Sequence, residues 1–103
     1  MGYNLSKLRV LIVDDSKNMR MLVKTVLNAL GVQVVREAGD GQAGLQELRS
    51  GPVDISIVDW VMEPMDGLEF VRQVATVETA KGVNIVILGN AWTVTPIAQT
   101  AAP

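Results

Sequence analysis

The feature that most limits the fold of this chain is a regular alternation of short apolar runs with helix-like segments. Three runs rich in Val, Ile and Leu have the length of buried β-strands: 8–13, 53–58 and 84–88. A weaker strand signal, Val34-Val35, lies within 33–38. Apolar residues at helical spacing follow Ser16, Asp40 and Asp66. This alternation predicts an α/β fold with a doubly wound parallel sheet joined by right-handed crossovers.

Length and composition limit the function as well. The 103 residues, 49% of them hydrophobic, suffice for one core, so we expect a single domain over 1–103. A net charge of −2 disfavours nucleic-acid binding, and no apolar run approaches the ~20 residues that span a bilayer. We therefore expect a cytoplasmic protein that contacts neither nucleic acid nor membrane directly. The absence of Cys and His excludes thiol chemistry, histidine catalysis and the usual zinc sites.

Three aspartates stand where predicted strands end. Asp14 and Asp15 follow the first strand, and Asp59 follows the third. Each could simply open a turn or cap a helix, which is the usual role of a single Asp in such a place. If the two strands are neighbours, however, the three carboxylates converge and repel one another unless a cation binds. With only oxygen ligands on offer, the trio favours a site for Mg²⁺ or Mn²⁺.

Two segments carry a family resemblance. The segment 10–16, with Met19 and Arg20 behind it, and the segment 57–70 resemble the first strand and the phosphoacceptor strand and loop of response-regulator receiver domains of the CheY type. The resemblance extends over about 8–88. It implies a flavodoxin-like parallel sheet in the order 2-1-3-4-5.

The resemblance also implies a function in two-component signal transduction, in which a histidine kinase or phosphotransfer protein supplies a phosphoryl group to Asp59. Mg²⁺ would bind Asp15, Asp59 and the backbone carbonyl of Val61, with Asp14 acting mainly through metal-bound water. The apolar Val61 side chain cannot hydrogen-bond an attacking water, so we expect slow self-dephosphorylation. The enzymatic activity would amount at most to self-phosphorylation and this slow reversal.

The chain departs from the receiver pattern after the fourth predicted strand. Gly89 occupies the position where receivers place the Ser or Thr that holds a phosphoryl oxygen, and no Lys follows Lys81. The usual last strand and helix are not recognisable in the uncharged tail 89–103. A second hypothesis is therefore a degenerate receiver that serves as an interaction or dimerisation module without phosphorylation switching. A small Mg²⁺-dependent phosphatase is a third hypothesis, but the sequence shows no recognisable general acid for it.

The tail itself has a hairpin pattern. Gly89 and Asn90 form a two-residue turn signal, and the alternating segment 91–95 follows it. We expect the tail to fold back antiparallel on the strand at 84–88 and to cover its edge. The alternative is that a second copy of the chain covers this edge, which would give a homo-oligomer through the fourth strand or the tail.

Two further side chains near the aspartates have competing interpretations. Trp60 lies over the mouth of the site or is an ordinary surface aromatic. Arg20 attracts an anionic partner or phosphate, or is simply a solvated charge on a helix.

Overall fold

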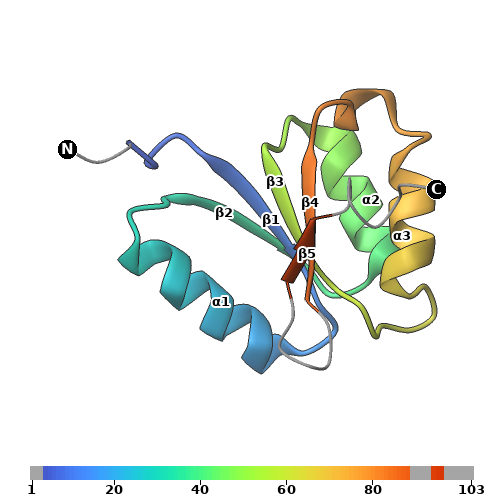
Figure 1. The fold of residues 1–103 in the computed structure, drawn as a ribbon, viewed down its shortest axis with the longest axis horizontal. Helices are drawn as coiled ribbons and strands as arrows, with labels where there is room; N and C mark the ends of the chain where they lie inside the picture. The colour runs from blue at the N-terminus through green and yellow to red at the C-terminus, as the bar shows by residue number, and fades with distance from the viewer. Residues whose placement is uncertain (1–3, 89–93, 97–103) are drawn as a thin grey trace.

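A computed structural model describes residues 4–88 and 94–96. Within these residues, five strands and three α-helices follow one another along the chain with one short 3₁₀ turn (Figure 1). The strands are β1 (Arg9–Val13), β2 (Val34–Ala38), β3 (Ile55–Asp59), β4 (Asn84–Leu88) and β5 (Val94–Pro96). The helices are α1 (Lys17–Ala29), α2 (Gly41–Ser50) and α3 (Gly67–Val74), and the 3₁₀ turn is η1 (Glu78–Ala80).

The strands form one sheet in the order β2-β1-β3-β4-β5, and β1 to β4 are parallel. The predicted α/β fold with a flavodoxin-like order 2-1-3-4 is therefore confirmed. Helix α1 lies on one face of the sheet, whereas α2 and α3 lie on the other (Figure 1). None of the helices in the described part of the chain is long and apolar enough to cross a membrane.

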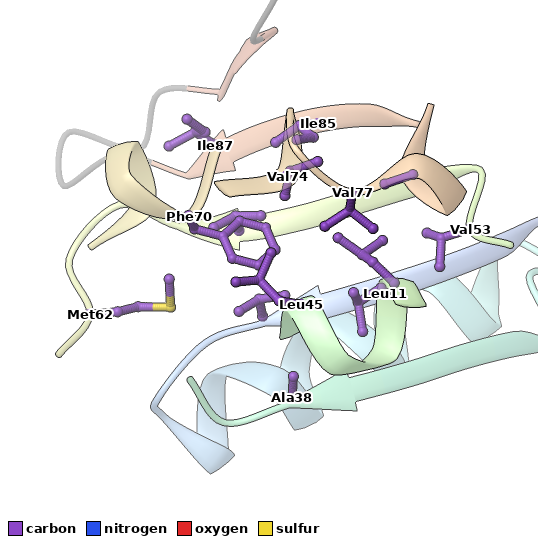
Figure 2. Packing of buried hydrophobic residues seen from close by; sticks show 14 residues of the cluster. Leu11, Ala38, Leu45, Val53, Met62, Phe70, Val74, Val77, Ile85 and Ile87 are labelled. Atoms are coloured by element: carbon purple, nitrogen blue, oxygen red, sulfur yellow. The ribbon is translucent and has the colours of Figure 1, made fainter. Parts of the chain in front are cut away.

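The larger core lies between the sheet and the α2–α3 layer. Leu11 and Val13 point from β1 into this layer and pack with Leu45 of α2 and Phe70 of α3, all of them buried (Figure 2). Because side chains alternate along a strand, Val10 and Ile12 face α1 instead. Burial on both faces explains why β1 is continuously apolar from Val10 to Val13.

Helix α1 is less buried than its apolar pattern predicts. Val23 and Leu27 pack against the sheet, but Leu22, Val26 and Leu30 are exposed, and no residue of the helix is fully buried. The physical reason is that α1 packs on this face of the sheet with no second helix beside it among the described residues (Figure 1). One stripe of the helix therefore faces the sheet and a second apolar stripe faces outward.

The expected capping residues begin all three helices. The side chains of Ser16, Asp40 and Asp66 accept hydrogen bonds from backbone N–H groups in the first turns of α1, α2 and α3. Glu69, three residues after Asp66, is placed in the sequence to return a side-chain hydrogen bond to the helix start, but it does not do so. Its carboxylate instead accepts a hydrogen bond from the side chain of Gln73, one turn further along α3.

β5 confirms that part of the tail folds back antiparallel on β4. The register pairs Leu88 with Val94 and Val86 with Pro96. A two-residue turn would pair Leu88 with Ala91, and the predicted turn at Gly89 and Asn90 lies outside the described residues. The connection 89–93 lies outside the described residues. It includes Gly89 and most of the predicted strand 91–95.

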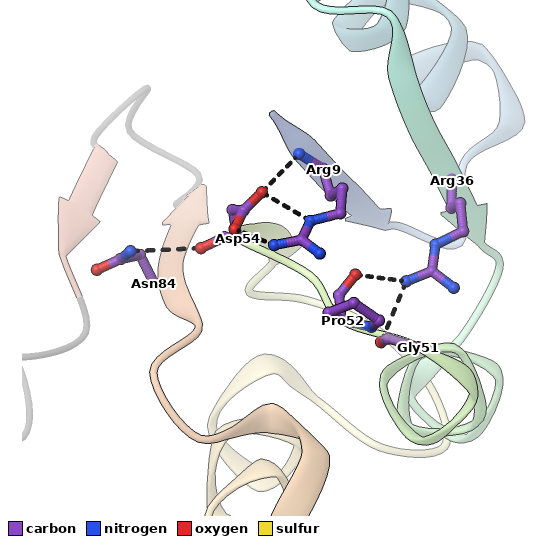
Figure 3. A network of polar contacts seen from close by, with 6 residues as sticks. All are labelled: Arg9, Arg36, Gly51, Pro52, Asp54 and Asn84. Atoms are coloured by element: carbon purple, nitrogen blue, oxygen red, sulfur yellow. Dashed lines mark hydrogen bonds and ion pairs between the residues drawn. The ribbon is translucent and has the colours of Figure 1, made fainter. Parts of the chain in front are cut away.

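A polar network joins the strands at their amino-terminal ends, away from Asp14, Asp15 and Asp59 (Figure 3). The Asp54 carboxylate, just before β3, accepts hydrogen bonds from the Arg9 backbone N–H at 2.8 Å and from the Arg9 guanidinium at 2.9 and 3.0 Å. These hydrogen bonds and the charge of Arg9 lower the pKa of Asp54 to about 2. The beginnings of β1 and β3 are thereby tied together.

Candidate functional site

The three aspartates meet at the carboxyl ends of β1 and β3. The two strands are adjacent and pair Val13 with Val58, so Asp14 leaves β1 next to the point where Asp59 ends β3. Carboxylate oxygens of Asp14, Asp15 and Asp59 lie within 4.8 Å of one another. The predicted convergence of the trio is confirmed, and we call these three residues the acidic trio.

The acidic trio is electrostatically strained in the absence of a cation. Asp14 is only 4% exposed, and burial, together with the nearby charge of Asp15, raises its pKa. Burial and the charge of Asp14 likewise raise the pKa of Asp59. Backbone N–H groups oppose these shifts, since Ser16 donates to Asp14 at 2.8 Å and Val61 donates to Asp59 at 3.4 Å. The balance still disfavours the ionised carboxylates.

The residues present fit a hard divalent cation. All three side chains offer only carboxylate oxygens, and their separation allows one ion to be shared among them. A bound dication would also relieve the repulsion that raises the pKa values of Asp14 and Asp59. The chemistry of the donor set therefore suits Mg²⁺ or Mn²⁺, as the sequence predicts.

The loop after β3 brings Trp60 and Val61 next to the acidic trio. Both side chains are largely exposed, Trp60 by 40% and Val61 by 52%. The Trp60 backbone N–H donates to the carbonyl of Leu88 on β4, which continues the strand pairing by one residue. Because the Trp60 side chain is exposed beside Asp59, it is available as a fluorescent reporter of this site.

Gly67 shapes the same loop, a role that sequence reasoning missed. Its N–H donates to the carbonyl of Trp60 at 2.9 Å, and a Cβ atom at this position would lie 2.9 Å from the backbone oxygen of Asp59. The start of α3 therefore packs directly against the backbone of the site, which only glycine permits. The Asp66-Gly67 pair is the available signal, but it reads equally well as an ordinary helix start.

The contacts of Arg20 contradict one of the two interpretations drawn from the sequence, that of a solvated helix charge. Its guanidinium donates to the backbone carbonyl of Asp14 and to the carboxylate of Glu37 on β2. The side chain is therefore bound within the protein and is not a freely solvated helix charge. Lys81, the last lysine of the given sequence, lies before the amino-terminal end of β4, and its ammonium pairs with the Glu78 carboxylate at 3.0 Å.

The comparisons with known proteins identify the family. The model of the response regulator receiver domain matches residues 10–102. The chain belongs to this family, whose members act in two-component signalling, and the acidic trio lies at the usual phosphorylation site and is typical of a receiver Mg²⁺ site. The chain is similar to the chemotaxis protein CheY of Pseudomonas aeruginosa, with 36% identity over 81 residues, which are 79% of this chain and 65% of the relative.

A second relative, the chemotaxis protein CheY-3 of Vibrio cholerae, is 33% identical over 79% of this chain and 62% of its own length. The chain thus spans less than two thirds of these relatives. Among solved structures, CheY4 of Vibrio cholerae covers 90% of this chain and 75% of its own, with 31% identity and a TM-score of 0.76. The receiver domain of the histidine kinase CKI1 from Arabidopsis thaliana, complexed with Mg²⁺ and BeF₃⁻, has 29% identity and a TM-score of 0.75, covering 82% of this chain and 67% of its own.

Proposed function

We propose that this receiver domain accepts a phosphoryl group on Asp59 from a histidine kinase or phosphotransfer protein, with Mg²⁺ bound by the acidic trio. The observation that carries the proposal is the convergence of three carboxylates within 4.8 Å at the ends of two adjacent parallel strands. Membership of the receiver family supports the same role. The backbone carbonyl of Val61 is the further metal ligand that the family resemblance implies.

The chain's own residues contribute position and charge to the transfer. The Asp59 carboxylate is the nucleophile: it forms a bond to phosphorus while the phosphorus–nitrogen bond of the donor phosphohistidine breaks. The N–H of Val61 holds one Asp59 oxygen, and Gly67 packs against the Asp59 backbone, so the nucleophile is held from two sides. Bound Mg²⁺ would neutralise charge on the phosphoryl oxygens, and Asp14 and Asp15 would retain the ion.

Phosphorylation at Asp59 is tested by intact mass after incubation with a small phosphodonor such as acetyl phosphate. We expect addition of one phosphoryl group in the presence of Mg²⁺ and none with excess EDTA. Asp59→Asn removes the nucleophile and should abolish the addition. Asp40→Asn is the matched control, because Asn also caps helices and this residue lies at the start of α2. Addition to the Asp59→Asn protein would contradict the proposal.

The side chain at Val61 should determine how long the phosphoryl group persists. An exposed apolar group at this position cannot orient a water for attack, whereas an amide can. We expect Val61→Asn to shorten the half-life of the phosphorylated protein roughly tenfold relative to the parent chain. The half-life is measured by following the loss of the added mass after removal of the phosphodonor. If the phosphorylated parent chain has a half-life equal to or shorter than that of phosphorylated Val61→Asn, the expectation is wrong.

A degenerate receiver that acts as an interaction or dimerisation module is the second candidate. Two observations favour it: the outward apolar stripe formed by Leu22 and Val26 of α1 with Leu30 at its C-cap, and Gly89 at the position where receivers place a Ser or Thr. Analytical ultracentrifugation with and without phosphodonor separates the two candidates. A mass that depends on protein concentration but not on phosphodonor would favour the interaction module.

A further inference from the structure

Arg20 connects three elements that meet beside the acidic trio. From α1, its Nη1 donates to the backbone carbonyl of Asp14, and its Nε donates to the Glu37 carboxylate on β2 at 3.1 Å. The side chain is only 17% exposed, although no residue of α1 is fully buried. We propose that Arg20 is a positioning residue for the metal: it fixes the backbone at Asp14 and so aims the carboxylates of Asp14 and Asp15. This inference rests on the proposed function, because it assumes that the acidic trio binds Mg²⁺.

The main-chain groups around Asp14 show why one more contact matters. The Asp14 N–H donates to the carbonyl of Ala38 at 3.1 Å, which extends the pairing of β1 with β2. The Asp14 carboxylate accepts the N–H of Ser16 at 2.8 Å. Arg20 then holds the Asp14 carbonyl, which belongs to the planar peptide unit that links Asp14 to Asp15. A contact to this unit constrains the direction in which both carboxylates leave the backbone.

The bridge requires an arginine held by Glu37. A guanidinium presents several N–H donors in one rigid plane and can bond to a carbonyl and a carboxylate at the same time. Glu37 orients this plane, and its second oxygen lies 3.7 Å from the Lys24 ammonium. Of these two contacts of Glu37, the one to Arg20 leads on to the backbone at Asp14. Ligand-orienting contacts of this kind commonly change metal affinity by about 10- to 100-fold.

Charge and positioning predict opposite effects when Arg20 is replaced. The guanidinium is a positive charge near the site of a dication, so its loss would by itself strengthen Mg²⁺ binding. Loss of the bridge to Asp14 would weaken binding, because the carboxylates would lose their common orientation. The direction of the change in affinity therefore distinguishes a positioning residue from a nearby charge. A residue that only stabilises the fold would change the melting temperature and leave the affinity alone.

The test is isothermal titration calorimetry of the full chain with MgCl₂, with melting temperatures recorded in EDTA. We expect Arg20→Gln to weaken Mg²⁺ binding about tenfold. Arg20→Lys keeps the charge but cannot bridge both partners, so it should also weaken binding. Glu37→Gln should act in the same direction with a smaller effect. Lys24→Gln is the matched control, since it removes a charge that pairs with Glu37, and we expect a change of about twofold or less.

Several results would overturn the positioning role. Unchanged or tighter binding in Arg20→Gln would do so, as would wild-type affinity in Arg20→Lys. If Arg20→Gln does not fold, Arg20→Lys and Glu37→Gln decide the question. The first keeps a cation beside Glu37, and the second keeps Arg20 beside the Asp14 carbonyl. Asp59→Asn distinguishes the failure of this inference from that of the proposed function. Loss of binding in Asp59→Asn with full binding in Arg20→Gln would reject only the positioning role, whereas a parent chain that binds no Mg²⁺ would reject both.

Discussion

Replacement of Phe70 by alanine is expected to lower the free energy of unfolding by about 3–5 kcal/mol. The ring is fully buried on α3 and belongs to the core between the sheet and the α2–α3 layer (Figure 2). Gly44 of α2 fits closely against it, since a Cβ atom there would lie 2.8 Å from Phe70 Cε1. The truncation would leave a cavity that this tightly apposed helix pair cannot readily close. Denaturant unfolding followed by circular dichroism measures the loss.

The matched control lies two residues away on the same helix. Leu68 is 39% exposed, so Leu68→Ala should change stability by about 0.5 kcal/mol or less. Domains of this size have roughly 5–15 kcal/mol of stability in total, so the Phe70 substitution removes a large part of it. Similar losses for the two variants would mean that Phe70 is not central to the core.

The fold and the position of the acidic trio could be predicted because both follow from local pattern and one topological rule. Apolar runs that end in Asp14 and Asp59 identify the strands and their carboxyl ends. The rule that ligands bind where neighbouring parallel strands end then brings the carboxylates together. Capping residues such as Ser16 and Asp40 mark helix starts in the sequence itself, so these boundaries could also be located.

Other features depend on contacts between distant segments, which local pattern does not encode. The bond from Arg20 to Glu37 joins α1 to β2, and nothing in the spacing of the two residues distinguishes it from other charge pairs. The approach of Gly67 to the Asp59 backbone depends on how the loop after β3 packs. The exposure of the outward stripe of α1 could not be predicted either, because a periodic pattern shows that a face is apolar but not what covers it.

Mg²⁺ is expected to stabilise the folded chain by about 2.7 kcal/mol when it is present at 100 times its dissociation constant. The proposed ion site exists only in the folded state, where the three carboxylates are held together, because the unfolded chain keeps no such cluster. Asp59→Asn should remove most of this stabilisation. The measurement is a series of denaturant titrations at increasing MgCl₂, and equal stabilisation of the two proteins would contradict a site at Asp59.

The same carboxylates determine how the Mg²⁺-free protein responds to acid. Because the pKa values of Asp14 and Asp59 are raised in the folded state, that state takes up protons first, and the penalty of their ionisation fades as pH falls from 7 toward the unfolded value of 3.8. Asp54 acts oppositely: its pKa of about 2 means that its stabilisation is complete above 3.8 and is lost as pH falls from there toward 2.

Stability in EDTA should therefore rise on mild acidification and fall at lower pH, whereas saturating Mg²⁺ should abolish the rise because the cation replaces the protons. Asp59→Asn should be more stable than the parent chain in EDTA at pH 7 and should gain less on acidification, since one of the two shifted groups is gone. Asp54→Asn should keep the rise at mild acidity and lose the fall that Asp54 causes. Unfolding midpoints measured from pH 7 to pH 2 in EDTA test each of these signs. A parent chain that loses stability steadily over the whole range would show that the acidic trio carries no such strain.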